Sequence, residues 1–429
     1  MNTKLSGKKI LFTNVPAEGH FNPLTGLAKY LQNEGCEIRW YCSNMFADRI
    51  KKMEIQHYPL VHALDINSSN IFKLIPELNT NDPLVRYQIY RVQYAKRSTE
   101  YFEDIKEIYE SFPFDLIVTD SFLPAIPFLK HKLNVPVVSI GVVPLAQDSV
   151  DTAPYGLALP PAENEETRVL YADLYAQHPD RCKAASDLFE SLLADYNIPY
   201  TRTSIENRLA READLLLQIG VPEFEYKRSD LGKNVRFIGA LLPYTKNSKK
   251  EPWYDEKIER YNKIVLVTQG TVEGDTTKIL EPTLLAFMGT DTLVIATTGG
   301  NGTERLRSKY AADNVIIEDY ISYEDVMRYA SVYVTNGGYG GTLLSIMNKL
   351  PMVTAGLHEG KNEICARVGY FKIGIDLKTE TPTSAAIFDG VNEILENNLY
   401  RENITHLSEK INSYDANQRC ASYIADLIK

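Results

Sequence analysis

Residues 331–348 read Ser-Val-Tyr-Val-Thr-Asn-Gly-Gly-Tyr-Gly-Gly-Thr-Leu-Leu-Ser-Ile-Met-Asn, with four glycines inside the octapeptide Thr335–Thr342. The apolar run 331–334 predicts a short buried strand, and residues 343–348 predict the start of a helix. A strand that turns into a helix through glycines presents free backbone N–H groups to an anion, with the positive end of the helix dipole behind them. An anion-binding turn is therefore one interpretation of the octapeptide, and a glycine-rich turn without a ligand fits it equally well.

The sequence on both sides of the octapeptide alternates apolar runs with helical patterns. In the C-terminal half we expect strands at 263–269, 292–297, 315–317 and 352–355, a helix at 278–288, a short helix from Tyr323, and helices from 384 to 429. Gly270–Thr271 and Gly299–Gly300 follow two of these strands as turns that offer N–H and hydroxyl donors. This β-α-β order predicts a parallel sheet covered by helices.

The N-terminal half repeats the same pattern. We expect strands at 9–15, 37–42, 114–120, 135–140, 215–218 and 235–239, and helices at 24–31, 87–112, 124–133, 166–195 and 201–211. Gly35 is expected to close the first helix, 65–85 is expected to form a surface loop and a short helix, and 144–165 is expected to be a loop. The first strand-to-helix turn lacks Gly-x-Gly-x-x-Gly, which disfavours a dinucleotide-dependent dehydrogenase.

A chain of 429 residues is too long for one core. The polar, charged segment 246–256 has no periodicity and is interpreted as part of a linker between two halves. We therefore expect an α/β protein with doubly wound parallel-sheet domains at 1–243 and 257–405, a linker at 244–256, and a ligand cleft between the domains.

The composition excludes several classes of partner. Forty-six basic and 56 acidic residues give a net charge of −10, which disfavours nucleic acid or an anionic membrane as the main partner. No apolar run is long enough to span a membrane, and residues 1–9 contain no hydrophobic signal core. The five scattered cysteines are interpreted as reduced thiols, which predicts a cytoplasmic protein.

Two polar residues follow strands of the expected N-terminal sheet. His20 comes directly after the first strand, and Asp120 ends a later one. The carboxyl ends of parallel strands share one edge, so the Asp120 carboxylate could reach the imidazole and select its tautomer. A histidine so placed can act as a general base, because its unperturbed pKa is near neutral. The alternatives are that His20 only begins a helix and that Asp120 only caps one.

The chain contains no Asp-x-Asp pair. The metal-chelating carboxylates that many sugar-nucleotide enzymes use are therefore absent from its sequence. Helix N-termini and backbone N–H groups are the available means of stabilising an anionic group, so we expect neither a metal nor another cofactor.

In this arrangement the whole chain resembles a family 1 glycosyltransferase of the GT-B fold, in the bacterial macrolide-type (UDP-glycosyltransferase-like) branch. The matching features are Gly19-His20-Phe21-Asn22-Pro23, Val118-Thr119-Asp120, Gly270-Thr271 and the region 320–365. The resemblance implies two Rossmann-like domains facing a central cleft, the first for the acceptor and the second for a nucleotide sugar, and a C-terminal helix at 406–429 that packs back on the first domain. It also implies inverting transfer, with His20 as the base and Asp120 as its partner.

The donor site that the resemblance implies departs from the family pattern at several positions. Tyr320 matches the aromatic ring that stacks on the nucleobase, but the usual glutamine is Tyr323 and the usual ribose-binding glutamate is Leu344. Asn336 replaces the usual histidine and cannot carry charge. Gly360–Lys361 replaces the acidic–Gln pair that holds the sugar. The full set of expected donor-binding residues is Gly19, Thr271, Tyr320, Ile321, Asn336, Gly338, Tyr339, Gly340, Gly341, Thr342, Glu359, Lys361 and Asn362.

The expected reaction is transfer of a hexose, taken as glucose, from a UDP- or dTDP-sugar to a hydroxyl of a hydrophobic small molecule. Loss of the two ribose contacts leads us to expect poor discrimination between UDP and dTDP donors. Apolar residues of the expected loops, Ile71, Phe72, Leu74, Tyr155 and Leu157, suit flavonoid, terpenoid or macrolide acceptors. The expected oligomeric state is a monomer or a weak homodimer. A sugar-nucleotide epimerase on the same fold and a non-catalytic nucleotide-sugar-binding protein are the alternatives.

Overall fold

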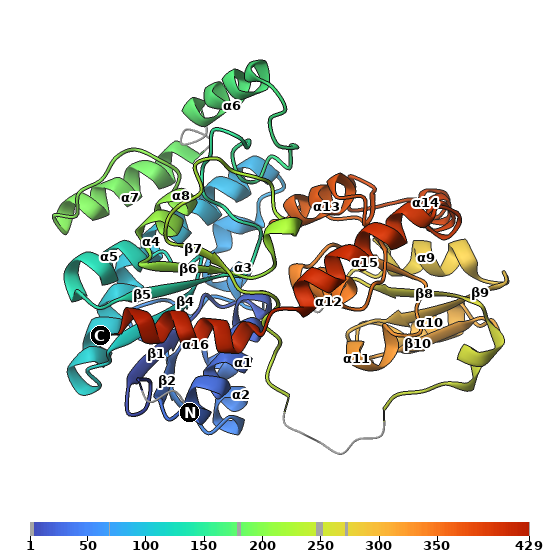
Figure 1. Cartoon of the computed structure of the whole chain (residues 1–429), viewed down its shortest axis with the longest axis horizontal. Coiled ribbons are helices and arrows are strands. Elements are labelled where there is room, and N and C mark those ends of the chain that lie inside the picture. Colours follow the sequence, from blue (N-terminus) through green and yellow to red (C-terminus); the bar gives the residue numbers. More distant parts are fainter. Residues whose placement is uncertain (1–3, 68, 178–181, 246–251, 271–272, 429) are drawn as a thin grey trace.

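The computed structural model describes residues 4–67, 69–177, 182–245, 252–270 and 273–428. The described chain is built on two fully parallel β-sheets, which Figure 1 shows side by side. We call the part around the first sheet the N-terminal lobe and the part around the second the C-terminal lobe.

The first sheet has seven strands in the order β3-β2-β1-β4-β5-β6-β7, and the second has six in the order β10-β9-β8-β11-β12-β13. In both sheets the strand order reverses beside the first strand, as in doubly wound folds. The strands are β1 (Lys9–Thr13), β2 (Glu37–Tyr41), β3 (Gln56–Tyr58), β4 (Leu116–Asp120), β5 (Val137–Gly141), β6 (Leu215–Gln218), β7 (Val235–Phe237), β8 (Lys263–Thr268), β9 (Thr292–Thr297), β10 (Val315–Glu318), β11 (Val332–Thr335), β12 (Met352–Thr354) and β13 (Gly374–Asp376).

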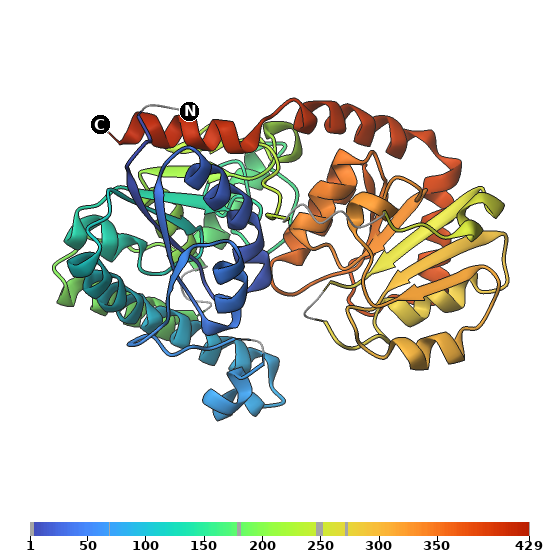
Figure 2. The same ribbon diagram turned by 90° about the horizontal axis from the view of Figure 1, so that it is seen from below.

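Helices cover both faces of each sheet (Figures 1 and 2). They are α1 (Glu18–Asn33), α2 (Ala47–Lys52), α3 (Ile71–Leu74), α4 (Pro83–Ser111), α5 (Ile126–Phe128), α6 (Glu165–Gln177), α7 (Lys183–Asp195), α8 (Ile205–Glu212), α9 (Leu280–Phe287), α10 (Thr303–Lys309), α11 (Tyr323–Val326), α12 (Tyr339–Met347), α13 (Lys361–Tyr370), α14 (Ser384–Glu396), α15 (Asn398–Asn412) and α16 (Ala416–Leu427). Short helical turns lie at Asn44–Phe46, Pro76–Asn79, Leu129–Leu133, Pro222–Phe224 and Glu256–Arg260.

The central strands form because their side chains are buried on both faces. All five residues of β4 are buried, as are all four of β11. Continuous apolar runs of this kind are typical of parallel strands covered by helices. The expected α/β architecture is therefore confirmed.

Several elements differ from the sequence-based expectation. The first helix, α1, begins at Glu18 rather than at Leu24, so Gly19 and His20 belong to its first turn. Pro23 is accommodated inside this helix near its start. The edge strands β3 and β13 were not expected; each is only three residues long. The segment after Gly360, treated as a loop, forms helix α13.

The lobes contact each other through elements that follow strand ends. Helix α1, which follows β1, packs against α12, which follows β11. The chain returns from the C-terminal lobe through α15, and α16 packs against α1 of the N-terminal lobe, as Figures 1 and 2 show in red. The carboxyl ends of strands from both sheets are thereby brought toward the same region.

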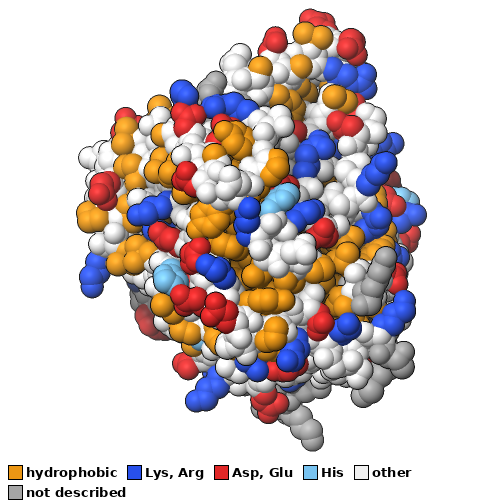
Figure 3. Space-filling view, turned by 90° about the vertical axis from the view of Figure 1, so that its left-hand side faces the viewer, with side chains coloured by type: hydrophobic (Ala, Val, Ile, Leu, Met, Phe, Trp, Pro, Cys, Tyr) orange, Lys and Arg blue, Asp and Glu red, His pale blue; other side chains and the backbone are white. Residues whose placement is uncertain are grey.

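The outer end of the N-terminal lobe shows basic and acidic side chains interspersed with apolar ones (Figure 3). That face therefore has no continuous basic surface of the kind that nucleic acids bind. No helix in the described ranges combines the length and the apolar character needed to cross a bilayer.

Candidate active site

His20 and Asp120 are in direct contact. His20 Nδ1 lies 2.8 Å from Asp120 Oδ1, and their side chains are 20% and 0% exposed. A carboxylate only accepts hydrogen bonds, so this contact places the proton of the neutral imidazole on Nδ1. The lone pair is then on Nε2, which has no protein partner among the described hydrogen bonds. The pair thus has the geometry of a base whose tautomer is set by a buried acid.

The Asp120 carboxylate is held by its own strand edge. Its Oδ2 accepts the Val15 N–H at 2.8 Å, and its Oδ1 also accepts the Phe122 N–H at 2.8 Å. Val15 follows β1 and Asp120 ends β4, and these neighbouring strands are paired in parallel register. Two backbone donors and the imidazole therefore satisfy a fully buried carboxylate, which would be costly to leave unpaired.

An aromatic cluster begins beside the imidazole; the sequence-based prediction named its member Tyr155 but missed Phe122 and Tyr94. The Phe122 ring lies edge-on to His20 with ring centroids 5.8 Å apart, and Tyr155 lies 6.3 Å beyond Phe122. Tyr94 of α4 donates its hydroxyl to the Phe122 carbonyl at 2.7 Å. The signal available in the sequence was the position of Phe122, two residues after Asp120. Tyr94 carries no comparable signal because it lies in the middle of a long helix.

The glycine-rich octapeptide forms the expected strand, turn and helix. Gly337 adopts φ +78°, and a Cβ there would lie 2.5 Å from Cys365 Sγ, so the position requires glycine. Gly338 is the N-cap of α12 and provides no side-chain cap. The first described backbone bond of this helix is from the Thr342 N–H to the Gly338 carbonyl at 2.9 Å. The N–H groups of residues 338–341 therefore have no protein acceptor among the described bonds, as helix starts leave them.

Asn336 is turned toward the first strand of the C-terminal sheet. Its Nδ2 donates to the Gln269 carbonyl at 2.6 Å, and Gly270 follows with φ +78°. Of the expected pair Gly270–Thr271, Thr271 lies outside the described residues. The Asn336 amide has a second N–H that this contact does not use.

The side chain of Tyr339 joins the two lobes. Its hydroxyl donates to the Ile219 carbonyl at 2.9 Å, just beyond β6 of the N-terminal lobe. Any donor contact by Tyr339 would therefore come from its backbone N–H. Gly340 faces open space, whereas Gly341 lies against the Tyr333 hydroxyl. Thr342 is fully buried, with no partner for its Oγ1 among the described residues.

Tyr320 and Ile321 lie at the other side of this region, after β10. The Tyr320 ring is 70% exposed, and its hydroxyl donates to the Gly299 carbonyl at 2.6 Å. An exposed ring fixed at its hydroxyl end can stack on a planar group. Ile321 is half-buried against the core. Gly19, in the first turn of α1, has open space where a Cβ would stand.

Tyr323 and Leu344, which stand at the positions of the expected ribose contacts, are directed into the protein. The Tyr323 hydroxyl lies 3.2 Å from Thr268 Oγ1. Leu344 is half-buried against the hydrophobic core. Neither side chain therefore presents a free carboxylate or amide.

The expected sugar-binding residues lie in the first turn of α13 and directly before it. Lys361 Nζ lies 2.5 Å from Glu359 Oε2 and is 19% exposed, so this lysine is paired rather than directed to open water. Asn362 Nδ2 donates to the Gly156 carbonyl of the N-terminal lobe at 2.8 Å. In this structure only Glu359 is largely exposed, at 61% of its side chain.

Within the described ranges, no group of three or more His, Cys, Asp and Glu side chains is arranged to hold a metal ion. The five cysteines are buried free thiols.

The two-lobed architecture is the GT-B fold, the fold of many glycosyltransferases. The crystal structure of the glycotransferase of kitacinnamycin shares this fold, with a TM-score of 0.78 at 18% identity over 99% of this chain and 100% of that chain. Residues 216–413 match the family described as "UDP-glucoronosyl and UDP-glucosyl transferase". This match covers most of the C-terminal lobe, and over those residues the chain is similar to that family.

Two curated relatives extend over almost the whole chain. The 4'-demethylrebeccamycin synthase of Lentzea aerocolonigenes is 28% identical over 417 residues, covering 96% of this chain and 97% of its own. The UDP-glucosyltransferase 1 of Beauveria bassiana is 29% identical over 433 residues, covering 96% of this chain and 94% of its own. The likeness therefore includes the N-terminal lobe, which the family match leaves largely outside.

Proposed function

We propose that this enzyme transfers a hexose, glucose in the first instance, from a UDP- or dTDP-sugar to a hydroxyl of a hydrophobic small molecule, with inversion and without a metal. The observation that carries the proposal is the contact between His20 Nδ1 and the buried Asp120 carboxylate, which leaves Nε2 free. A positioned base of this kind contributes about 10²–10⁴-fold to a rate.

In the proposed reaction, His20 Nε2 accepts the proton of the acceptor hydroxyl as the oxygen attacks the anomeric carbon. A new carbon–oxygen bond forms, and the bond from the anomeric carbon to the diphosphate breaks. The nucleoside diphosphate leaves with the electron pair, and the proton remains on the imidazolium. Asp120 stabilises that cation, because it already bonds the other ring nitrogen at 2.8 Å.

The diphosphate is assigned to the N-terminus of α12. Its free N–H groups at residues 338–341 and the helix dipole favour an anion that gains charge as the bond breaks. The exposed Tyr320 ring is the proposed stacking surface for the nucleobase. Glu359, the exposed acid beside α13, is the proposed contact for sugar hydroxyls.

The acceptor is assigned to the aromatic residues beside His20. Phe122, Tyr155 and Tyr94 provide flat apolar surfaces there, and such rings dominate the binding of planar ligands. The names of the relatives compared above, which refer to demethylrebeccamycin and kitacinnamycin, support natural-product aglycones as the acceptor class. The exposed Phe72 of α3 contributes to the acceptor site only if that helix also lines it.

The proposal is tested by incubating the protein with UDP-glucose and a panel of phenols and alcohols, followed by mass spectrometry. A hexose added to an acceptor supports a transferase. A new nucleotide sugar formed without any acceptor would identify an epimerase instead. Donor binding without either product would identify a non-catalytic binding protein.

We expect the enzyme to accept UDP-glucose and dTDP-glucose at similar rates. Tyr323 and Leu344 offer no free group for a ribose 2′-hydroxyl, and discrimination without such a contact is small, about tenfold at most. The measurement is the initial rate with each donor at equal, subsaturating concentration. Leu344→Glu, which places a carboxylate at the position implied by the family resemblance, should raise the preference for UDP. A wild-type preference for UDP beyond about a hundredfold would contradict this prediction.

We expect Asn336→His to lower the KM for the donor by about tenfold, because a charged hydrogen bond to a phosphate is stronger than one from an amide. The measurement is steady-state kinetics with donor and acceptor varied separately. Asn348→His is the matched control, since Asn348 also donates to a carbonyl, that of Leu344 at 2.8 Å, but at the other end of α12. A change in acceptor preference instead of donor KM would mean that the donor site is misplaced.

A further inference from the structure

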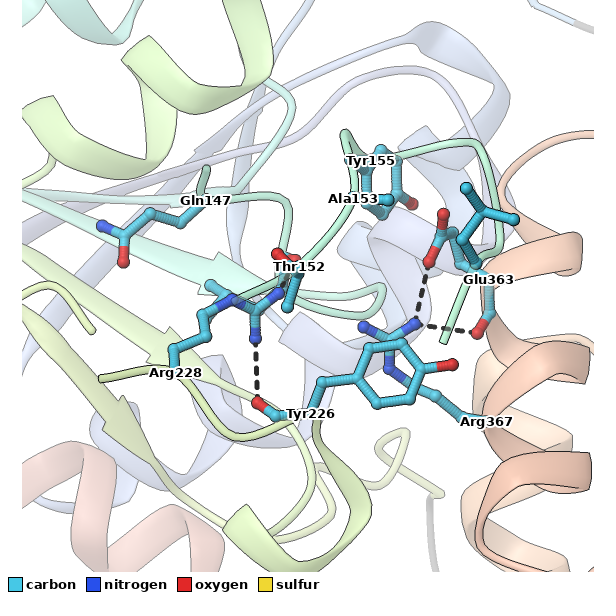
Figure 4. A pocket seen from close by; sticks show the side chains of 10 residues that line it. Gln147, Thr152, Ala153, Tyr155, Tyr226, Arg228, Glu363 and Arg367 are labelled. Atoms are coloured by element: carbon cyan, nitrogen blue, oxygen red, sulfur yellow. Dashed lines mark hydrogen bonds and ion pairs between the residues drawn. The ribbon is translucent and has the colours of Figure 1, made fainter. Parts of the chain in front are cut away.

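The loop that follows β5 is attached to the opposite lobe. The Glu363 carboxylate of α13 accepts the N–H groups of Gly156 and Ala158 at 2.7 and 2.8 Å. Asn362 adds its bond to the Gly156 carbonyl at 2.8 Å. Three hydrogen bonds from the start of one helix therefore hold both sides of Leu157. Figure 4 shows Glu363 beside this loop.

Glu363 is itself held by a buried network between the lobes. Arg367 bonds Glu363 at 2.9 Å and Glu225 of the N-terminal lobe at 2.6 Å, and its guanidinium lies 4.2 Å from the Tyr226 ring centroid. The Arg367 and Glu225 side chains are 2% and 5% exposed. Burial raises the pKa of Glu225, but Arg367 and Arg228 outweigh it and hold that pKa below its ordinary value. Arg367, itself buried and paired with Glu225, thus holds the Glu363 carboxylate in place.

This attachment places the side chain of Tyr155. The residue directly precedes Gly156, and its ring lies beside Phe122, which in turn contacts His20. Its hydroxyl reaches the start of α13, where a Cβ on Gly360 would lie only 2.8 Å away. Gly360 also has φ +76°, so glycine allows this approach for two reasons. Tyr155 therefore reaches from Phe122, which contacts the expected base His20, to Gly360 in the expected sugar-binding segment.

Tyr155 can provide an apolar contact surface for a ligand, but it cannot act as a general base. Burial raises the pKa of its hydroxyl, which is therefore neutral at physiological pH. No described hydrogen bond uses this hydroxyl, so the ring provides the main contact surface. The backbone beside Tyr155 is fixed by the bonds at Gly156, and its hydroxyl end packs against Gly360. A ring packed in this way loses little conformational freedom when a flat ligand contacts it.

We infer that Tyr155 is a specificity-determining residue of the acceptor pocket and that Glu363 is the positioning residue that places it. The lobe assigned to the donor thus completes the wall of the acceptor pocket in the other lobe. This inference rests on the proposed function. It gives Glu363 a role that is separate from donor binding.

The first test compares Tyr155→Ala with Tyr155→Phe, using a flat aromatic acceptor found in the panel above. Loss of the ring should raise the acceptor KM by about tenfold, whereas Phe keeps the wall and should leave that KM within about twofold. Donor KM should change less than acceptor KM in both variants. An unchanged acceptor KM in a folded Tyr155→Ala variant, or a Phe variant that behaves like Ala, would overturn the inference.

The second test asks whether Glu363 acts through Tyr155. Glu363→Gln should raise the acceptor KM, and adding Tyr155→Ala should raise it little further, because both changes remove the same wall. Glu281→Gln is the matched control: Glu281 is also a buried acid of the C-terminal lobe, bonded to Arg305 and Lys309. This control should lower thermal stability without changing the acceptor KM.

Effects of Glu363→Gln and Tyr155→Ala that multiply would show that Glu363 acts elsewhere, which would refute its positioning role. Failure of the proposed function is distinguishable from failure of this inference. In the first case the wild-type enzyme forms no glycoside at all. In the second case it forms glycoside, and the Tyr155 variants retain the wild-type acceptor KM.

Discussion

Replacement of His20 by Ala is expected to reduce kcat for glycosylation of oxygen acceptors by about 10³-fold, the central range for removal of a positioned general base. The imidazole is the group that can take the hydroxyl proton, because Nδ1 is committed to Asp120 at 2.8 Å and Nε2 is free. Donor KM should change little, since the proposed donor contacts lie in the C-terminal lobe. Steady-state kinetics with mass-spectrometric detection of the glycoside provide the measurement.

His62→Ala is the matched control for this prediction. His62 also pairs with an acid of the same lobe, with Nε2 2.8 Å from Glu107 Oε1, but both side chains of this pair are exposed. The hydrogen bond to Glu107 raises the pKa of His62. The control variant should keep wild-type kcat. Undiminished turnover in His20→Ala would show that the base has been misassigned.

Asp120→Asn is expected to lower kcat by about 10²–10³-fold, because an amide in place of the carboxylate can no longer stabilise the imidazolium. It should also lower the free energy of unfolding by about 1–3 kcal/mol. Asp120 accepts the N–H groups of Val15 and Phe122 as well as that of His20, and an amide NH₂ must face at least one of these donors. Kinetics and chemical denaturation measure the two effects separately.

The expected loss of stability needs a control variant that lowers the free energy of unfolding without removing a contact of His20. Asp104 is 3% exposed and accepts the backbone N–H groups of Val61, His62 and Ala63 and the Tyr41 hydroxyl at 2.6 Å. Asp104→Asn should therefore lose comparable stability and keep its kcat.

A double-mutant cycle separates the catalytic role of Asp120 from its structural one. If Asp120 acts through His20, Asp120→Asn should reduce kcat little further in a His20→Ala background. Losses of kcat that multiply in the double variant would contradict the assignment of Asp120 as the partner of the base.

Much of the fold was predictable because parallel strands buried on both faces leave a strong pattern. Leu116–Asp120 and Val332–Thr335 are uninterrupted runs of buried residues, and the glycines that follow the latter mark its turn. The strands that escaped notice, Gln56–Tyr58 and Gly374–Asp376, lie at sheet edges. Edge strands of three residues are covered on fewer sides, so hydrophobic burial leaves little periodicity in their sequence.

The starts of two helices at the site, α1 and α13, were predicted wrongly for a different reason. Pro23 suggested that the first helix starts after it, yet α1 begins at Glu18. Pro23 lies beyond the first four N–H groups, so it removes one helical hydrogen bond, and the helix continues because Phe21, Leu24 and Leu27 are buried along it. The start of α13 was missed because its N-cap is Gly360 in a left-handed conformation, with no capping side chain. Neither feature is visible as a periodic pattern.

The sequence alone placed His20 and Asp120 at one edge of the N-terminal sheet. Both follow neighbouring parallel strands, and chain direction alone brings the ends of such strands to one edge. It also determined the free N–H groups at residues 338–341, since helix geometry leaves them unpaired wherever the helix lies. Only the tertiary structure decided that Glu363 holds the loop around Tyr155, some two hundred positions earlier in the chain. That contact depends on how the two lobes pack, and side chains that meet across an interface share no local periodicity.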